Sequence, residues 1–339
     1  MSLEDLRQRA KAIQNVRPSI VLLSGGEPAE HEDILEIVRI LAKEFRFKVS
    51  MITNGIRLGT EEVFASQLKQ AGLRKACIAF DTLKPEVSMR MRGRADLIEI
   101  KRKAFQHGSD AGLKCSMVTT VCDANVSEMG DLLRFVLQTK HALSVWEIHC
   151  FQQSGRMPAD IQSVDREQII KTLIRSEVIA GLKPDDFSIS LAIPALGLCV
   201  HPDCGSALLI LSKEGKGRLL SDEFDQTGFF RALSKTSFWS TYFARLWFAA
   251  VFLKHFGLRG LCLLRHGLRG ERSDSERLIL ISIASPMSPE KLDCERVKRC
   301  TNAVVLADGS LHPMCFYYSY ENSQKGVSPP LFTYRDFSF

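Results

Sequence analysis

Near the start of the sequence, an apolar run ends in residues that could hold a ligand. The segment Ser19–Pro28 reads Ser-Ile-Val-Leu-Leu-Ser-Gly-Gly-Glu-Pro. Gly25 and Gly26 have no Cβ, so a ligand can approach their backbone N–H and C=O groups, and Glu27 offers an acceptor for an amine. An ordinary strand-to-helix turn would use the same residue types. The segment predicts a buried strand that ends in an open, polar turn.

Four cysteines in the C-terminal half have spacings that could bind a metal. Cys199 and Cys204 precede one predicted hairpin, and Cys300 and Cys315 flank a second, whose turn is Asp308-Gly309. Such a turn folds the chain back on itself and brings its flanking cysteines together. Four thiolates suit a 4Fe-4S cluster or tetrahedral zinc, and buried thiols without metal are the alternative. His201 is a further candidate ligand or an exposed loop residue.

The composition describes a globular protein. The chain has 339 residues, 45% of them hydrophobic, and a formal charge of +6 that is spread along most of its length. This mild charge does not indicate a nucleic-acid partner. The first residues contain no apolar signal region, so we expect a cytoplasmic protein whose ten cysteines are reduced.

Up to about Phe151, short apolar runs alternate with helical patterns, as in repeated β/α units with a parallel sheet. The predicted strands are Ile20–Leu23, Val49–Thr53, Ala76–Phe80, Lys114–Val121 and Val145–Cys150. Ligands of parallel sheets lie at the carboxyl ends of the strands, and nearly all residues of this chain at those ends are polar. These residues are Gly25, Gly26, Glu27 and Pro28, then Thr53, Asn54 and Gly55, then Asp81, then Thr119, Thr120 and Asn125, and last Gln152, Gln153, Ser154 and Arg156. Helix caps and turns are the alternative role for each of them.

The β/α pattern stops after Phe151, so we expect one domain over 1–160 and a second over 161–339. The second contains the stretch 238–264, which is apolar and aromatic but is interrupted by Arg245, Lys254 and His255. The apolar runs between these charged residues are too short to cross a bilayer, which needs roughly 20 consecutive apolar residues. A core helix, an apolar substrate channel and a helix on the membrane surface, with nearby basic residues toward anionic lipid, are the three interpretations.

The strand-end segments together resemble the radical S-adenosylmethionine (radical SAM) superfamily over about Ser19 to Arg156. The resembling segments are Gly25-Gly26-Glu27-Pro28, Thr53-Asn54-Gly55 and the Asp81 that follows Ile78-Ala79-Phe80. The resemblance implies that Gly25, Gly26 and Glu27 bind the amino group of S-adenosylmethionine. It further implies that Asn54, Asp81, Gln153 and Arg156 line the rest of the cofactor or the substrate.

The C-terminal part is similar to a narrower group, the lipid-coupling enzymes of the tetraether lipid synthase type. The similar segments are His201–Gly205, Asp293–Cys300, Asp308-Gly309 and His312–Cys315. The resemblance implies an auxiliary 4Fe-4S cluster on Cys204, Cys300 and Cys315, with Cys199 as fourth ligand by spacing and Cys294 as its rival. It also implies an apolar or lipid substrate modified at unactivated carbon. We further expect an electron donor, and the stretch 238–264 adds the expectation of a peripheral membrane contact.

One expected motif of the superfamily is absent from the sequence. The three cysteines of its reductive cluster follow the spacing Cys-x3-Cys-x2-Cys, which does not occur in the 339 residues. The remaining cysteines read as buried small hydrophobes; they are Cys77, Cys115, Cys122, Cys150 and Cys262. Cleavage of the cofactor needs an electron from such a cluster.

The expected fold is therefore α/β: a partial (β/α) barrel of radical SAM type without its first strand, followed by a smaller α+β domain of cysteine-flanked hairpins. We interpret the chain as the larger part of a truncated enzyme that is inactive in isolation and has an open edge on Ile20–Leu23. A non-catalytic partner derived from the same family is the alternative. An ordinary α/β enzyme fits the β/α pattern but not the cysteine hairpins.

Overall fold

The structure is a computed structural model. It describes residues 1–139, 143–152, 160–187, 189–190, 202–223, 246, 250, 253–254, 256–257, 276–287, 292–298, 300 and 302–317.

One sheet of nine strands organises the described residues. Its order is β1-β2-β3-β4-β5-β9-β7-β6, with β8 beside β7. The strands are β1 (Val21–Leu23), β2 (Val49–Thr53), β3 (Lys75–Ala79), β4 (Lys114–Val121), β5 (Leu143–Cys150), β6 (Ile189–Ser190), β7 (Gly205–Lys213), β8 (Lys216–Leu219) and β9 (Arg277–Ala284). Neighbours from β1 through β5 to β9 are parallel, whereas β7 is antiparallel to β9. The fold is mixed α/β with a mostly parallel sheet.

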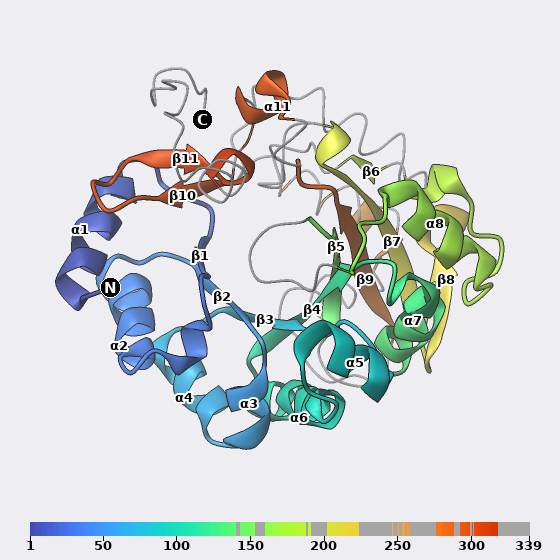
Figure 1. Cartoon of the computed structure of the whole chain (residues 1–339), viewed down its shortest axis with the longest axis horizontal. Coiled ribbons are helices and arrows are strands. Elements are labelled where there is room, and N and C mark those ends of the chain that lie inside the picture. The colour runs from blue at the N-terminus through green and yellow to red at the C-terminus, as the bar shows by residue number, and fades with distance from the viewer. Residues whose placement is uncertain are drawn as a thin grey trace.

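The helices cover the outside of this sheet. Figure 1 shows the strands following one another around an arc, with α2, α3, α4, α5, α6 and α7 outside it. The helices are α1 (Leu3–Gln14), α2 (Ile34–Arg39), α3 (Ile56–Thr60), α4 (Phe64–Ala71), α5 (Pro85–Arg92), α6 (Leu97–Asp110), α7 (Met129–Gln138), α8 (Arg166–Arg175) and α11 (Cys294–Lys298). Side chains alternate between the two faces of a strand, so each strand has a helix-facing set and an inner set.

The main hydrophobic core lies between the helices and the sheet. On β3, Ala76 and Ile78 belong to this core, and Phe80, directly after the strand, stacks on Phe135 of α7 with ring centroids 4.8 Å apart. Stripes of apolar helix residues spaced three or four apart are buried here, for example at Ile37 and Val38 of α2 and Leu68 of α4. Val63, which the same spacing predicts to be buried, is instead 61% exposed just before α4. Burial of these stripes against the sheet holds the β/α units in register.

The five strands predicted from the sequence are confirmed, with ends that shift by at most two residues. The strand β9 was not predicted. Its sequence Arg-Leu-Ile-Leu-Ile-Ser-Ile-Ala has the β-branched pattern of a buried strand, and it lies beside β5 in parallel register. One sheet therefore contains strands from both sides of residue 160.

Both predicted hairpins are present. β7 and β8 form the first, and a separate two-stranded sheet of β10 (Ala303–Val305) and β11 (Leu311–Pro313) forms the second. The second hairpin contacts α1, where the Arg9 guanidinium donates to the carbonyl of Val305 at 2.7 Å. A Cβ on Gly309 would lie 2.7 Å from the Cβ of Ala12, so hairpin and helix touch closely. The N-terminal helix thus supports the C-terminal cysteine hairpin.

The edge of the sheet at β1 is open among the described strands, because β1 has a neighbour only in β2. Ile20 and Leu22 are 52% and 46% exposed there, in agreement with the expected open edge. Within the described residues, no helix has the length and apolar character required to cross a membrane. Most of the apolar stretch 238–264 lies outside the described residues.

Helices α3 and α6 pack closely at Gly59, so a substitution at this residue tests their packing. A Cβ at Gly59 would lie 2.0 Å from the carbonyl oxygen of Ile100. Although alanine is the better helix former by about 1 kcal/mol, we expect Gly59→Ala to lower the free energy of unfolding by roughly 3 kcal/mol, because backbone must move. Urea denaturation measures this change. The control is Gly26→Ala, whose Cβ would meet nothing within 4 Å, and an equal loss there would contradict the packing argument.

Candidate functional site

The carboxylate of Glu27 joins the turns that follow β1 and β2. Its Oε1 accepts hydrogen bonds from the hydroxyl of Thr53 at 2.6 Å and the backbone N–H of Ala29 at 3.0 Å. Its Oε2 accepts from the backbone N–H of Asn54 at 2.6 Å. Glu27 also caps the 3-10 helix η1 (Pro28–Glu30), with Pro28 at its first position. Because a carboxylate has about four acceptor positions, Oε2 retains capacity for a ligand amine.

The two glycines before Glu27 form an open shelf. Gly25 has a φ of +139°, which a residue with a side chain rarely adopts. Gly25 and Gly26 are both exposed, and a Cβ on either would meet no atom within 4 Å. Next to them, the side-chain oxygen of Asn54 accepts from the N–H of Ile56 at 2.8 Å, which begins α3. Backbone groups at Gly25 and Gly26 are thus accessible beside a turn that Glu27 holds rigid.

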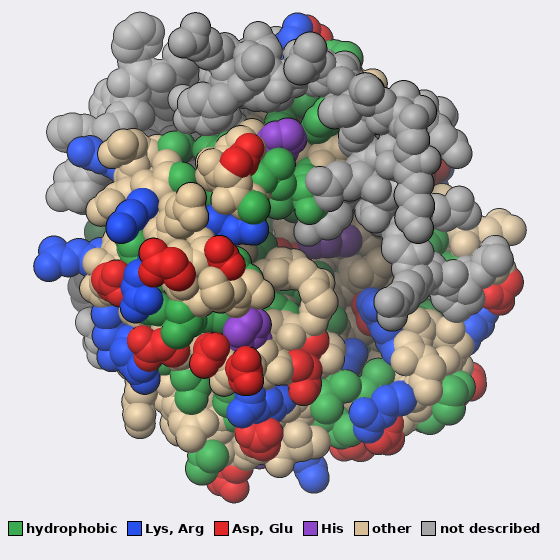
Figure 2. Space-filling model, turned by 60° about the vertical axis from the view of Figure 1, so that its left-hand side comes forward, with side chains coloured by type: hydrophobic (Ala, Val, Ile, Leu, Met, Phe, Trp, Pro, Cys, Tyr) green, Lys and Arg blue, Asp and Glu red, His purple; other side chains and the backbone are tan. Residues whose placement is uncertain are grey.

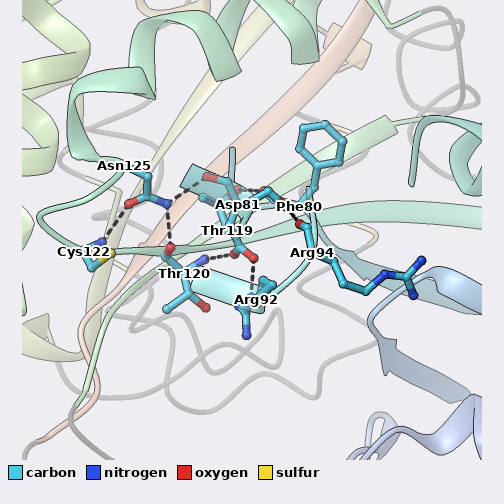
Figure 3. A network of polar contacts seen from close by, with 9 residues as sticks. Phe80, Asp81, Arg92, Arg94, Thr119, Thr120, Cys122 and Asn125 are labelled. Carbon is cyan, nitrogen blue, oxygen red and sulfur yellow. Dashed lines mark hydrogen bonds and ion pairs between the residues drawn. The ribbon is translucent and has the colours of Figure 1, made fainter. Parts of the chain in front are cut away.

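Asp81 forms a second connection, between the ends of β3 and β4 (Figure 3). The residue is only 3% exposed. Its Oδ1 accepts from the N–H of Thr120 at 2.9 Å, and its Oδ2 accepts from Nε of Arg92 at 2.8 Å. Asn125 donates from its amide to the carbonyls of Asp81 and Thr120 at 2.8 and 2.9 Å. Both oxygens of Asp81 therefore have protein donors, and its contact with a ligand stays a prediction.

Two cations surround Asp81, and sequence reasoning did not single out either one. Arg92 comes from the end of α5 and Lys101 from the buried side of α6. Burial raises the pKa of Asp81, but the charges of Arg92 and Lys101 outweigh it, so the pKa lies below its usual value. Burial lowers the pKa of Lys101. A lysine within the apolar stripe of α6 was the signal that could have revealed this position.

These side chains line a small cavity at the carboxyl end of β3, with a volume of about 10 Å³. That volume is room for about one water molecule. The lining residues are Asp81, Thr82, Ser88, Arg92, Leu97, Ile98 and Lys101.

The buried ion pair of Asp81 predicts a dependence of stability on pH. Because the folded pKa of Asp81 is lowered, its contribution to stability is complete above the unfolded pKa of about 4 and is lost as the pH falls through the folded pKa. We expect Asp81→Asn to lower the free energy of unfolding at neutral pH by about 3 kcal/mol and to flatten its fall in acid. Denaturation curves across pH measure both effects. The control is Asp131→Asn, which breaks an exposed ion pair with Arg134. An equally large loss of unfolding free energy in this control would contradict the role of Asp81.

The loop after β5 is described only in part. Gln152 donates from its amide to the carbonyl of Pro286 at 2.9 Å and so connects β5 with the segment after β9. Gln153 and Arg156, predicted to bind the cofactor, lie outside the described residues, and so does Ser154.

Three of the four predicted metal-binding cysteines are described. Cys204 ends the 3-10 helix η6 (Pro202–Cys204), and Cys300 and Cys315 flank the β10–β11 hairpin. Burial, with a smaller contribution from the nearby thiols of Cys315 and Cys204, raises the pKa of the Cys300 thiol to about 11. Arg296 donates to the sulfur of Cys204 at 3.6 Å and to the carbonyl of Ser285 at 2.8 Å. The three thiols are thus close enough to influence one another.

These thiols do not form a complete metal site in the described residues. No group of three Cys, His, Asp or Glu side chains is placed to hold a metal ion within that part of the chain. Cys199 and His201 lie outside it, and Cys294 is exposed. Four of the five cysteines predicted to be buried small hydrophobes are buried, namely Cys77, Cys115, Cys122 and Cys150. Cys262 lies outside the described residues.

Comparison with known proteins agrees with the geometry at the strand ends. Residues 1–136 match the model of the radical SAM superfamily. This part of the chain, with its parallel β/α units and Gly-Gly-Glu-Pro strand end, is a radical SAM domain.

Several curated relatives carry the name GTP 3',8-cyclase. A probable GTP 3',8-cyclase of Methanothermobacter marburgensis is 33% identical over 151 residues, which are 44% of this chain and 48% of the relative. The GTP 3',8-cyclase of Peptoclostridium acidaminophilum is 25% identical over 191 residues, 56% of this chain and 57% of the relative. The chain thus spans about half the length of the curated relatives it matches.

Among solved structures, a domain of pyruvate-formate lyase-activating enzyme from Bacteroides vulgatus aligns with a TM-score of 0.37 at 13% identity, covering 46% of this chain and 94% of that one. SuiB of Streptococcus suis bound to S-adenosylmethionine aligns with a TM-score of 0.34 at 19% identity, covering 41% of this chain and 33% of that one.

Proposed function

We propose that this protein binds S-adenosylmethionine at the carboxyl ends of β1 and β2 and belongs to an enzyme that carries out radical SAM chemistry. The observation that carries the proposal is the open Gly25-Gly26 shelf beside a turn fixed by Glu27, within a radical SAM domain. The backbone of the shelf would contact the methionine part of the cofactor, and the spare acceptor capacity of Glu27 would hold its amino group. Asn54, in the turn after β2, donates its backbone N–H to Glu27 and would line the same site.

S-adenosylmethionine supplies a carbon radical when an iron–sulfur cluster reduces it. The chain's described residues fit the binding part of this task, since they offer a shelf, an anionic acceptor and a rigid turn. The cysteine motif of the reductive cluster is absent from the 339 residues. We therefore assign binding and orientation of the cofactor to these residues, and no electron-transfer step.

The absence of that motif favours a second candidate function. A protein of this fold could bind the cofactor or a complete radical enzyme and contribute no radical chemistry itself. S-adenosylmethionine cleavage by the purified, anaerobically reconstituted chain with a chemical reductant would exclude this candidate.

Binding of the cofactor can be tested through Glu27. Alanine at this position would remove three hydrogen bonds that hold the turns together, so Glu27→Gln is the better variant. We expect Glu27→Gln and Gly26→Val each to weaken S-adenosylmethionine binding at least about tenfold. The first removes the negative charge that attracts the cofactor's amino group, and the second fills the space above the Gly25-Gly26 backbone. Isothermal titration calorimetry measures the affinity. Glu167→Gln removes an exposed charge on α8 and serves as control; unchanged binding by both site variants would refute the proposal.

We further propose an auxiliary 4Fe-4S cluster held by Cys204, Cys300 and Cys315, with Cys199 as the fourth ligand. What supports it is that Cys300 and Cys315 flank a hairpin that contacts α1 and that Cys204, at the end of η6, lies near Cys300. Binding of a cluster would draw these thiols closer together than they lie here. The raised pKa of Cys300 means that a bound metal would have to displace its proton.

The cluster proposal predicts a change that is visible in the spectrum. Anaerobic reconstitution with iron and sulfide should give the brown colour of an iron–sulfur protein, and Cys300→Ala with Cys315→Ala should abolish it because two thiolates are lost. Iron and sulfide analysis checks the stoichiometry. Cys115→Ala, on β4, is the control and should keep the colour, and Cys294→Ala should also keep it if Cys199 rather than Cys294 is the fourth ligand. A colourless protein that binds one zinc would contradict an iron–sulfur cluster and favour a zinc site.

The substrate of the proposed enzyme has two candidates. The relatives named GTP 3',8-cyclase favour a nucleotide. A lipid substrate, an electron donor and contact with a membrane surface stay predictions from the sequence, because the apolar stretch behind them lies largely outside the described residues.

A further inference from the structure

The inner face of the sheet, opposite the helices, carries an unusual set of polar side chains. Alternation along β3 places Ala76 and Ile78 in the helix-facing core and leaves Lys75 and Cys77 on the inner face. The same alternation assigns to this face Ser50 of β2, Ser116 of β4, and Glu147 and His149 of β5. The described sheet is open at β1, so its inner face is not the filled interior of a closed barrel. Charged groups on this face are therefore candidates for contacts with a ligand.

An ion pair lies at the centre of this set. The ammonium of Lys75 lies 3.0 Å from Oε1 of Glu147, and the hydroxyl of Ser116 donates to the same oxygen at 3.4 Å. Their side chains are 26% and 27% exposed, so the pair is accessible from the inner side. Figure 2 shows that one face of the molecule is hollowed near its centre, with histidine, basic and hydrophobic side chains visible there.

Unused hydrogen-bonding capacity remains around the pair. Both contacts to Glu147 fall on Oε1, so Oε2 is left as an acceptor among the described residues. An ammonium has three donors; Glu147 occupies one and the neighbouring Cys77 side chain engages another, which leaves one for a ligand. The hydroxyl of Ser50, whose register partner on β3 is Lys75, is buried without a hydrogen-bond partner. Unpaired buried polar groups cost free energy, which a bound polar ligand would recover.

Burial alone would lower the pKa of Lys75, but the attraction of Glu147 raises it, so the pair is favourable in the folded protein. A fold of this kind nevertheless does not require an ion pair at this position. Replacing a half-buried ion pair by apolar residues of similar size is often neutral or stabilising, because the charges lose their hydration. A ligand that uses both charges does account for it. The Oε2 atom of Glu147 would accept an N–H of such a ligand, and the remaining donor of Lys75 would reach a carbonyl beside that N–H.

We propose that Lys75 and Glu147 bind the polar edge of the substrate, and that this edge is a cyclic amide, with an N–H donor next to a C=O acceptor. Glu147 accepts from the N–H and Lys75 donates to the carbonyl. His149 lies further toward the carboxyl end of β5, on the side of the proposed cofactor site. This proposal depends on the proposed function in one respect, namely that the substrate lies on the same face of the sheet as the cofactor. A hydrocarbon chain has no polar group that could pair with Lys75 or Glu147, so this site would not favour a lipid chain.

Inosine is the probe for this site, because its ring carries an N–H next to a C=O, and 1-methylinosine keeps the carbonyl but loses that N–H. We expect the wild-type chain to bind inosine at least tenfold more tightly than 1-methylinosine in calorimetric titrations. The double variant Lys75→Met/Glu147→Leu should lose this preference without a lower melting temperature, because neither charge is left unpaired. The control is Glu167→Gln/Lys171→Met, which removes an exposed pair on α8 and should keep the preference.

Equal affinity for the two nucleosides, no binding of inosine, or an unchanged preference in the double variant would each overturn the proposal. Titration of S-adenosylmethionine into the same proteins separates the two hypotheses. Cofactor binding without inosine discrimination defeats the cyclic-amide site alone. Inosine discrimination without cofactor binding defeats the proposed function and leaves the site standing.

Discussion

The ends of the parallel strands depend on side-chain oxygens that satisfy the backbone N–H groups of the neighbouring turn. Glu27 accepts from the N–H of Asn54 and so ties the turn after β1 to the turn after β2. Asp81 accepts from the N–H of Thr120 and ties β3 to β4. Where a strand stops, its neighbour's backbone groups lose their ladder partners, and leaving them unpaired costs free energy. These connections hold the site edge rigid in a region that would otherwise be loop.

This arrangement separates the residues that build the site from the residues that remain for a ligand. Both oxygens of Asp81 have protein donors, one of them Arg92, whereas Glu27 accepts three protein hydrogen bonds and keeps acceptor capacity on Oε2. Open backbone at Gly25-Gly26 and the inner charges of Lys75 and Glu147 have capacity to spare. The engaged groups thus set the geometry, and the open groups offer the contacts.

The C-terminal half completes the same structure. β9 extends the parallel sheet beyond β5, and β7 adds an antiparallel neighbour to it. The β10–β11 hairpin returns to the start of the chain, where Arg9 of α1 binds the carbonyl of Val305. Segments almost 300 residues apart in the sequence therefore support one another, and the hairpin that Cys300 and Cys315 flank packs against α1.

The sequence alone determined the β/α units, because period-2 and period-3.6 apolar patterns are local properties of the chain. It also indicated the Gly-Gly-Glu-Pro shelf, the Asp-Gly hairpin and the burial of Cys77, Cys115, Cys122 and Cys150. Only the tertiary structure decided which polar groups face one another. The pairing of Lys75 with Glu147 joins residues 72 positions apart, and the partners of Asp81 come from α5 and β4. Strand order and register fix such distances, and neither follows from local pattern; the parallel place of β9 beside β5 was missed for the same reason.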